Sequence, residues 1–203
     1  MDVFEVFRKR KSVRSYKPTP VPMQTLGKVL EAARLAPSAG NIQPWRFIIV
    51  TDSDKRQRIA QGCRYGRFLD ESPVVIVGCG DQKASPRWYV GDTCIAMEHL
   101  VLAATAEGLG TCWIGVFDEK ELRELLKIPL RLRVVALLAL GYAGGKLDLP
   151  AKLAHLIRPR KQLEKIAYLE EYGQKFLGHN APRKKRGSLR GISPRGHASE
   201  PSY

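Results

Sequence analysis

The sequence predicts an α+β protein in which a mixed central β-sheet is covered by helices on both faces. Segments with apolar residues at helical spacing alternate with short runs rich in Val, Ile and Leu, as expected for a sheet that is buried on both sides. One helical segment, residues 89–107, is apolar around most of its circumference and therefore packs on several sides. The chain has 203 residues, of which 44% are hydrophobic, enough to bury one sizeable core.

The N-terminal part alternates helices with strands. Asp2 and Glu5 stand at capping-box spacing at the start of a short helix, and Ser53 can cap a polar one. Apolar periodicity and these caps predict helices at residues 2–10, 22–36 and 53–62. Runs rich in Phe, Ile and Val predict buried strands at residues 46–51 and 73–79.

The same alternation continues after the apolar helix at residues 89–107. Strands are predicted at residues 111–116 and 133–141, separated by a helix that Asp118 and Glu121 can cap. A further helix is predicted at residues 163–172. Residues 178–203 are rich in Gly, Pro, Ser and Arg and have few apolar residues to bury, which predicts disorder. We therefore expect one domain at residues 1–177, followed by a basic tail at 178–203.

Composition bounds the cellular setting and the partners. The longest apolar run, residues 134–140, is far shorter than the roughly 20 residues that a membrane helix needs. The N-terminus carries charges through every turn and lacks a secretory pattern, so we expect a cytoplasmic protein without a membrane partner. The net charge of +14 indicates an anionic partner, which could be nucleic acid, a membrane surface or phosphorylated small molecules.

The four cysteines stand singly along the chain, without a CxxC pair, and the histidines show no metal-ligand spacing. We expect buried, reduced thiols and no metal site. A catalytic or redox-sensing cysteine would need a partly exposed, electropositive setting, which this sequence pattern does not identify.

Two basic clusters lie far apart in the sequence. Arg10, Lys11, Ser12 and Arg14 follow the first helix, and Arg158-Pro-Arg160-Lys161 follows the last strand. Guanidinium forks with a hydroxyl suit a phosphate group. The alternative for each cluster is an ordinary solvated basic turn.

Two further segments offer contacts to a flat heterocycle. The loop PSAGNIQPW contains Ser38, Asn41 and Gln43, and amide side chains can donate and accept at once, as the edge of a flavin pyrimidine requires. The alternative is an ordinary turn, with Trp45 in the core in either case. The segment GLGTCWIG ends a helix and enters a strand, and its glycines allow close backbone approach. It is not a dinucleotide fingerprint, which has the opposite order of strand and helix.

Together, in this order and spacing, the four segments closely resemble the flavin-dependent nitroreductase family. Its members share an R-x-S-x-R/K stretch, a PS-x-x-N-x-QPW loop, a GLG-x-x-W-I-G turn and a C-terminal basic pair. The match runs from about Val3 to Tyr168, and the QPW loop is its most specific element. The resemblance implies an FMN-dependent oxidoreductase that takes hydride from NADH or NADPH and reduces a nitroaromatic, quinone or similar acceptor.

The resemblance also implies which residues bind the cofactor. The FMN phosphate, ribityl chain and pyrimidine edge would be held by Arg10, Ser12 and Arg14, with Lys11 alongside. Two C-terminal residues, Arg158 and Arg160, would also bind the phosphate. The loop that would approach the flavin from the partner subunit contains Pro37, Ser38 and Asn41. Arg67 would place a positive charge facing flavin N1 and the C2 carbonyl. The backbone near flavin N5 is assigned to Ile114, Gly115 and Val116, where the family often has Glu-Gly or Gly-Gly at the last two positions. No catalytic side chain is expected, because the cofactor performs the chemistry.

We expect a homodimer, because the apolar helix at residues 89–107 has more apolar faces than one subunit's sheet can cover. Two alternatives stay open. One is a specialised dehydrogenase or dehalogenase of the same family. The other is a nucleic-acid-binding protein that uses its basic tail, although that tail has no aromatic residues between its basic ones before Tyr203.

Overall fold

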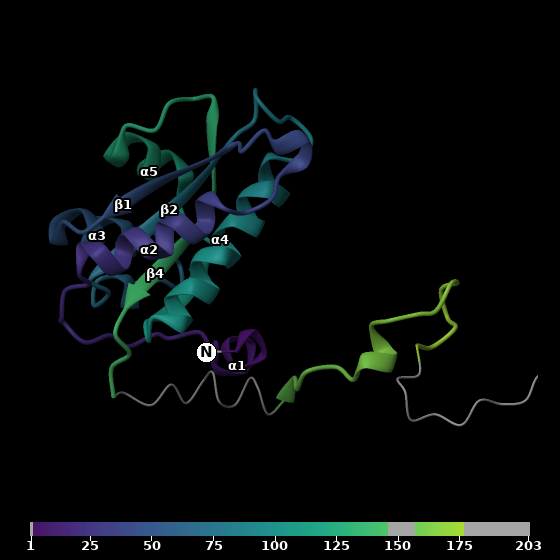
Figure 1. Ribbon diagram of the computed structural model, residues 1–203. Helices are drawn as coiled ribbons and strands as arrows, with labels where there is room; N and C mark the ends of the chain where they lie inside the picture. Colours follow the sequence, from purple (N-terminus) through teal and green to yellow (C-terminus); the bar gives the residue numbers. More distant parts are fainter. Residues whose placement is uncertain (1, 146–156, 177–203) are drawn as a thin grey trace, which may run out of the picture. The chain divides into compact units, whose positions relative to one another are not determined.

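The structure is a computed structural model that describes residues 2–145 and 157–176 (Figure 1). By its internal contacts the chain divides into two units, Met1–Leu149 and Pro150–Tyr203, and each is described by itself. The predicted domain boundary at residue 177 and the tail at 178–203 lie outside this description. No helix in the described part is long and apolar enough to cross a membrane.

The first unit is built on one four-stranded sheet. Its strands are β1 (Trp45–Val50), β2 (Val74–Asp81), β3 (Gly110–Ile114) and β4 (Leu132–Gly141). Their order is β1-β2-β4-β3 and all three pairings are antiparallel. The α+β class is confirmed, but the expectation of mixed pairing is wrong for these strands. Among the described residues, one parallel pairing is present, an isolated bridge between Ser12 and Thr111.

Helices cover both faces of this sheet, as predicted. The first unit contains α1 (Val3–Lys9), α2 (Met23–Arg34), α3 (Ser53–Gln61), α4 (Tyr89–Ala106) and α5 (Glu119–Leu126). Figure 1 shows α2 and α4 side by side, and both belong to the hydrophobic cluster on one face; α3 and α5 belong to the cluster on the other. Neighbouring β2 residues go to opposite clusters, Val75 to one and Ile76 to the other. Strand β2 is apolar from Val74 to Gly80 because it is buried on both sides.

The helix caps agree only in part with the expected ones. The Asp118 carboxylate accepts from the Glu121 backbone N–H at 3.0 Å and caps α5, as predicted. Helix α3 is capped by Asp52, not by Ser53, through the backbone N–H of Lys55 at 2.9 Å. Asp2 makes no side-chain capping hydrogen bond, and the Glu5 carboxylate pairs with Lys9 at 2.7 Å.

The predicted helix at residues 163–172 is wrong. In the second unit only a short 3-10 helix, η3 (Leu163–Lys165), forms there. The chain then reverses through Glu170 and Gly173, whose φ angles are 62° and 97°, and an isolated bridge pairs Tyr168 with Lys175. Left-handed backbone at these two residues is incompatible with a continuing helix.

Candidate functional site

The first basic segment lies along the edge of β3. Besides the bridge from Ser12, the backbone N–H of Val13 donates to the Thr111 carbonyl at 2.8 Å. The hydroxyl of the buried Tyr16 donates to the Val13 carbonyl at 2.7 Å, and burial raises the pKa of that phenol. Gly110 makes the approach possible, since a Cβ there would lie 2.6 Å from a methyl of Val13. These contacts hold the segment against the sheet, with Ser12 and Arg14 exposed beside it.

A pocket of about 150 Å³ opens next to this segment. Its lining combines Arg14, Tyr65 and Phe68 with the end of β3 and the turn after it, residues 112–116. The structure thus brings together Arg14 and the triplet Ile114, Gly115 and Val116, which are far apart in the sequence. A Cβ built on Gly115 meets no atom within 4 Å, so the backbone there is open to a neighbouring molecule.

Helix α1 ends at Arg10, whose backbone N–H donates to the Val6 carbonyl at 2.9 Å. The positive charge of Arg10 lowers the pKa of Glu98 in α4. The Glu98 carboxyl group also accepts a hydrogen bond from the side chain of Trp113, which lines the pocket. Burial raises the pKa of Glu98, although Arg10 and Trp113 act against that rise. Glu98 therefore links the first basic segment to the pocket. Sequence reasoning missed it, and the available signal was a carboxyl group within an apolar helix.

The PSAGN loop, residues 37–43, forms a compact turn before β1. Gly40, Asn41 and Gln43 have φ angles of 57°, 54° and 53°. The backbone N–H of Gln43 donates to the Ser38 hydroxyl at 2.9 Å, and its side-chain amide donates to the Asn41 side-chain oxygen at 3.0 Å. Asn41 and the exposed Pro37 do not line the pocket of this chain. Trp45, just after the loop, is buried as predicted.

Arg67 belongs to a different pocket. It opens the 3-10 helix η2 (Arg67–Leu69), and its side chain lines a space of about 520 Å³ together with Arg64 and residues of α3. Tyr65 and Phe68, on the same short segment, line the smaller pocket beside Arg14. Residues 64–68 therefore contribute to both spaces, with their arginines lining the larger one and their aromatic rings the smaller one. Sequence reasoning missed both rings.

Arg158 and Arg160 lie in the second unit, just before η3, and both are exposed. They are described only within that unit, so their predicted role at the phosphate stays a prediction. The cysteines are free thiols, and Cys63, Cys79 and Cys112 are buried, as expected. Burial raises the pKa of both Cys63 and Cys79 to about 11, which keeps these thiols protonated and unreactive at neutral pH.

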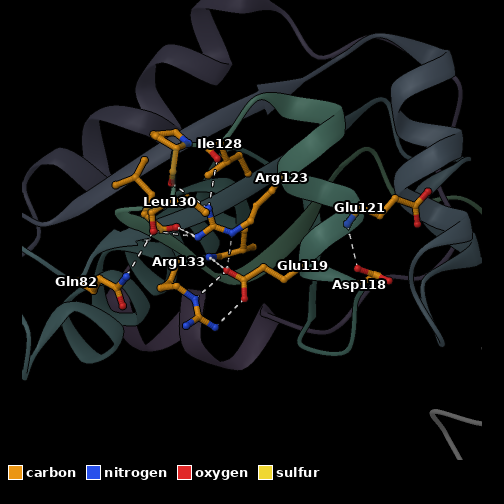
Figure 2. Close-up of polar contacts among 11 residues, drawn as sticks. Gln82, Asp118, Glu119, Glu121, Arg123, Ile128, Leu130 and Arg133 are labelled. Atoms are coloured by element: carbon orange, nitrogen blue, oxygen red, sulfur yellow. Dashed lines mark hydrogen bonds and ion pairs between the residues drawn. The ribbon is translucent and has the colours of Figure 1, made fainter.

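An ion-pair network fixes the helix that follows the pocket turn (Figure 2). Glu119, in the first turn of α5, accepts from the Arg133 guanidinium at 2.8 and 3.0 Å and from the Val134 backbone N–H at 3.1 Å. The hydrogen bond from Arg133 lowers the pKa of Glu119 most. Arg123 pairs with the same carboxylate at 3.3 Å and donates to the carbonyls of Ile128, Pro129, Leu130 and Leu132. The start of α5, and with it residues 115–118, is thereby tied to β4.

Comparisons with known proteins agree with this geometry. The model of the nitroreductase family matches residues 7–65 and 61–142. A protein of Archaeoglobus fulgidus, provisionally named an NADH dehydrogenase/NAD(P)H nitroreductase, is 38% identical over 146 residues, which are 68% of this chain and 84% of that protein. The FMN reductase (NAD(P)H) of Bacillus subtilis is 28% identical over 193 residues, covering 84% of this chain and 74% of that protein.

A solved structure of a related protein also has a similar fold. The FMN-dependent nitroreductase of Clostridium difficile superposes with a TM-score of 0.70 at 30% identity, covering 83% of this chain and 99% of that one. The family match spans the first basic segment, the PSAGN loop and the pocket turn, which are the elements that the fold brings to one unit. The chain belongs to the nitroreductase family.

Proposed function

We propose that this protein is an FMN-dependent oxidoreductase that oxidises NADH or NADPH and reduces a nitroaromatic, a quinone or a similar acceptor. The observation that carries the proposal is the pocket in which Arg14, two aromatic rings and the open backbone at Gly115 meet. The names of the relatives support the cofactor and the reductant, since one is an FMN reductase acting with NAD(P)H and another is an FMN-dependent nitroreductase.

The residues present fit a flavin. Tyr65 and Phe68 offer flat apolar surface, Arg14 offers a charged donor, and Gly115 leaves backbone unshielded. When bound, FMN supplies the hydride acceptor and donor that no side chain of the pocket could replace. The chain's own part is to bind and orient: Arg14 faces the polar edge, the backbone of Ile114, Gly115 and Val116 lines the reacting side, and the rings exclude water.

The phosphate end of the cofactor is assigned to the two basic clusters. Arg10, Lys11 and Ser12 stand at the N-terminal side of the pocket segment, and Arg158 with Arg160 supplies the second cluster. Planar guanidinium groups bind phosphate oxygens in pairs, which suits a terminal phosphate. This assignment predicts FMN rather than FAD. We propose that Arg67 reaches flavin N1 from the same short segment as Tyr65 and Phe68, which requires its side chain to turn away from the larger space that it lines here.

A second copy of the chain is proposed to complete the site. A pocket of about 150 Å³ is smaller than the roughly 300 Å³ from which ligand pockets usually begin, so the described residues of one chain enclose only part of the ligand. Large apolar side chains are exposed on α1 and α4, namely Val3, Phe4, Phe7, Val90 and Ile95. We propose that these pack in a homodimer, in which Pro37, Ser38 and Asn41 approach the partner's flavin. A flavin-loaded monomer in sedimentation at micromolar concentration would contradict this.

The test of the function is direct. Purified protein is expected to carry noncovalent FMN, visible in its absorbance spectrum, and the protein stripped of cofactor is expected to take up FMN in preference to FAD. Anaerobic titration with NADH and with NADPH should then bleach the flavin absorbance. No flavin uptake, or a clear preference for FAD, refutes the proposal.

A further inference from the structure

Helix α4 buries a carboxyl group that the proposed chemistry does not use. Asp92, in the first turn, is only 3% exposed, although it lies in a predominantly apolar helix. Its Oδ1 accepts from the backbone N–H of Ala39 at 3.2 Å. Its Oδ2 has no hydrogen-bond partner among the described residues. Burying a carboxyl group with one oxygen unpaired opposes folding, so a role other than stability is indicated.

The group that Asp92 contacts is the PSAGN loop. Ala39 lies between Ser38 and Asn41, two residues that the proposed function assigns to the cofactor. Most other hydrogen bonds of this loop run within it, such as those from Asn41 N to the Ser38 carbonyl and from Ile42 N to the Ala39 carbonyl. Arg46 of β1 adds a bond to the Gln43 carbonyl at 3.2 Å, at the far end of the loop. The hydrogen bond from Ala39 to Asp92 thus connects the N-terminal part of the loop to helix α4.

The loop needs such a tie because its backbone is unfavourable. Asn41 and Gln43 both have positive φ angles, a region that residues with a side chain seldom adopt. A turn of this kind persists only when the surrounding structure holds it. The Asp92 carboxylate accepts from the Ala39 backbone N–H and so holds the loop from outside, at the residue after Ser38.

We infer that Asp92 is a positioning residue: it fixes the Ala39 backbone and so presents Ser38 and Asn41 at the flavin site. This inference rests on the proposed function. Asp92 itself does not touch the cofactor, because its side chain is buried beneath the loop. The Asp92→Ala variant removes the acceptor, and the Asp92→Asn variant keeps one carbonyl oxygen in the same place with nearly the same volume.

The first measurement uses the protein without FMN. Amide hydrogen exchange at Ala39 should accelerate about tenfold or more in Asp92→Ala, because its hydrogen-bond acceptor is lost, and should stay near the wild-type rate in Asp92→Asn. The control is Asp52→Ala, which removes a similar acceptor from the α3 cap, where the bond to Lys55 N measures 2.9 Å. That variant loses a comparable contact away from the loop. Its Ala39 exchange should match the wild type.

The second measurement uses FMN-loaded protein. Asp92→Ala is expected to bind FMN about tenfold more weakly and to shift the absorption bands of the bound flavin, with Asp92→Asn restoring most of both. Asp52→Ala should change neither. Unchanged Ala39 exchange and FMN affinity in Asp92→Ala overturn the inference, and so do equal changes in Asp52→Ala. If wild-type protein takes up no FMN, the proposed function itself fails, which the wild-type titration reveals before any variant is compared.

Discussion

Gly115 allows the flavin pocket to be tested without damaging the fold. It lies on the pocket lining, its φ angle is not in the left-handed region, and a Cβ there meets nothing within 4 Å. Alanine is therefore compatible with the native backbone and reduces the entropy of the unfolded chain. Such substitutions stabilise by about 0.4–1 kcal/mol, which for a chain of this size raises Tm by about 1–4 °C.

The same change should impair binding. Gly115 lines a space of about 150 Å³ that the proposal assigns to the flavin. We expect Gly115→Ala to weaken FMN binding slightly, and Gly115→Leu, which places a large branched side chain at the pocket lining, to weaken it at least tenfold, or ~1.4 kcal/mol. Stability and binding should thus change in opposite directions in Gly115→Ala.

The assay pairs thermal unfolding of the cofactor-free protein with titration of FMN fluorescence. Gly27 supplies the matched control, since it lies in the interior of α2 and a Cβ there also meets nothing within 4 Å. Gly27→Ala should stabilise by about 1 kcal/mol and leave FMN binding unchanged. Wild-type FMN affinity in a folded Gly115→Leu protein would show that the flavin does not occupy this pocket.

Four further predictions concern single charged residues and the basic tail. Glu119→Gln should lower the free energy of unfolding at pH 7 by about 2 kcal/mol. Because Arg133 lowers the folded-state pKa of Glu119, the stability it adds is lost as the pH falls through that pKa, so the deficit in urea unfolding should shrink in acid and a constant deficit would refute it. Arg67→Ala should slow flavin reduction about a hundredfold in stopped flow with little loss of FMN, and a wild-type rate would assign Arg67 to its own pocket alone. Arg158→Ala should show the reverse pattern, weak FMN retention with normal reduction of the loaded fraction. Deleting residues 178–203 should leave FMN binding and NAD(P)H oxidation intact in the same assays, and loss of either would place the boundary elsewhere.

Most of the fold could be predicted because its signals are local. The strands and the long helices were recognised from apolar periodicity, and each ends within a few residues of the expected position. The predicted helix at residues 163–172 is wrong because a left-handed residue such as Glu170 has no reliable signature in the sequence. The cap of α3 failed for a similar reason, since Asp52 and Ser53 are both good caps and only the structure distinguishes them.

The site was harder to predict because it depends on contacts between distant segments. Motif spacing placed Arg14 and Gly115 in one site, and the structure brings them to one pocket. Tyr65, Glu98 and Asp92 have no motif of their own. Their importance comes from what packs against them: a pocket, a tryptophan and a loop backbone, respectively. Such residues become recognisable only when the tertiary contacts are known.

The contact between Gly110 and Val13 makes two distant positions interdependent for protein engineering. Any side chain at residue 110 would collide with Val13 and push the first basic segment away from β3. Ser12 and Arg14 would move with it, because they flank Val13. A redesign of the cofactor site that enlarges residue 110 therefore needs glycine at 13 in the same step, because a Cβ at 110 would also lie 2.9 Å from the Cβ of Val13, and a library that randomises residue 110 alone should yield few functional variants.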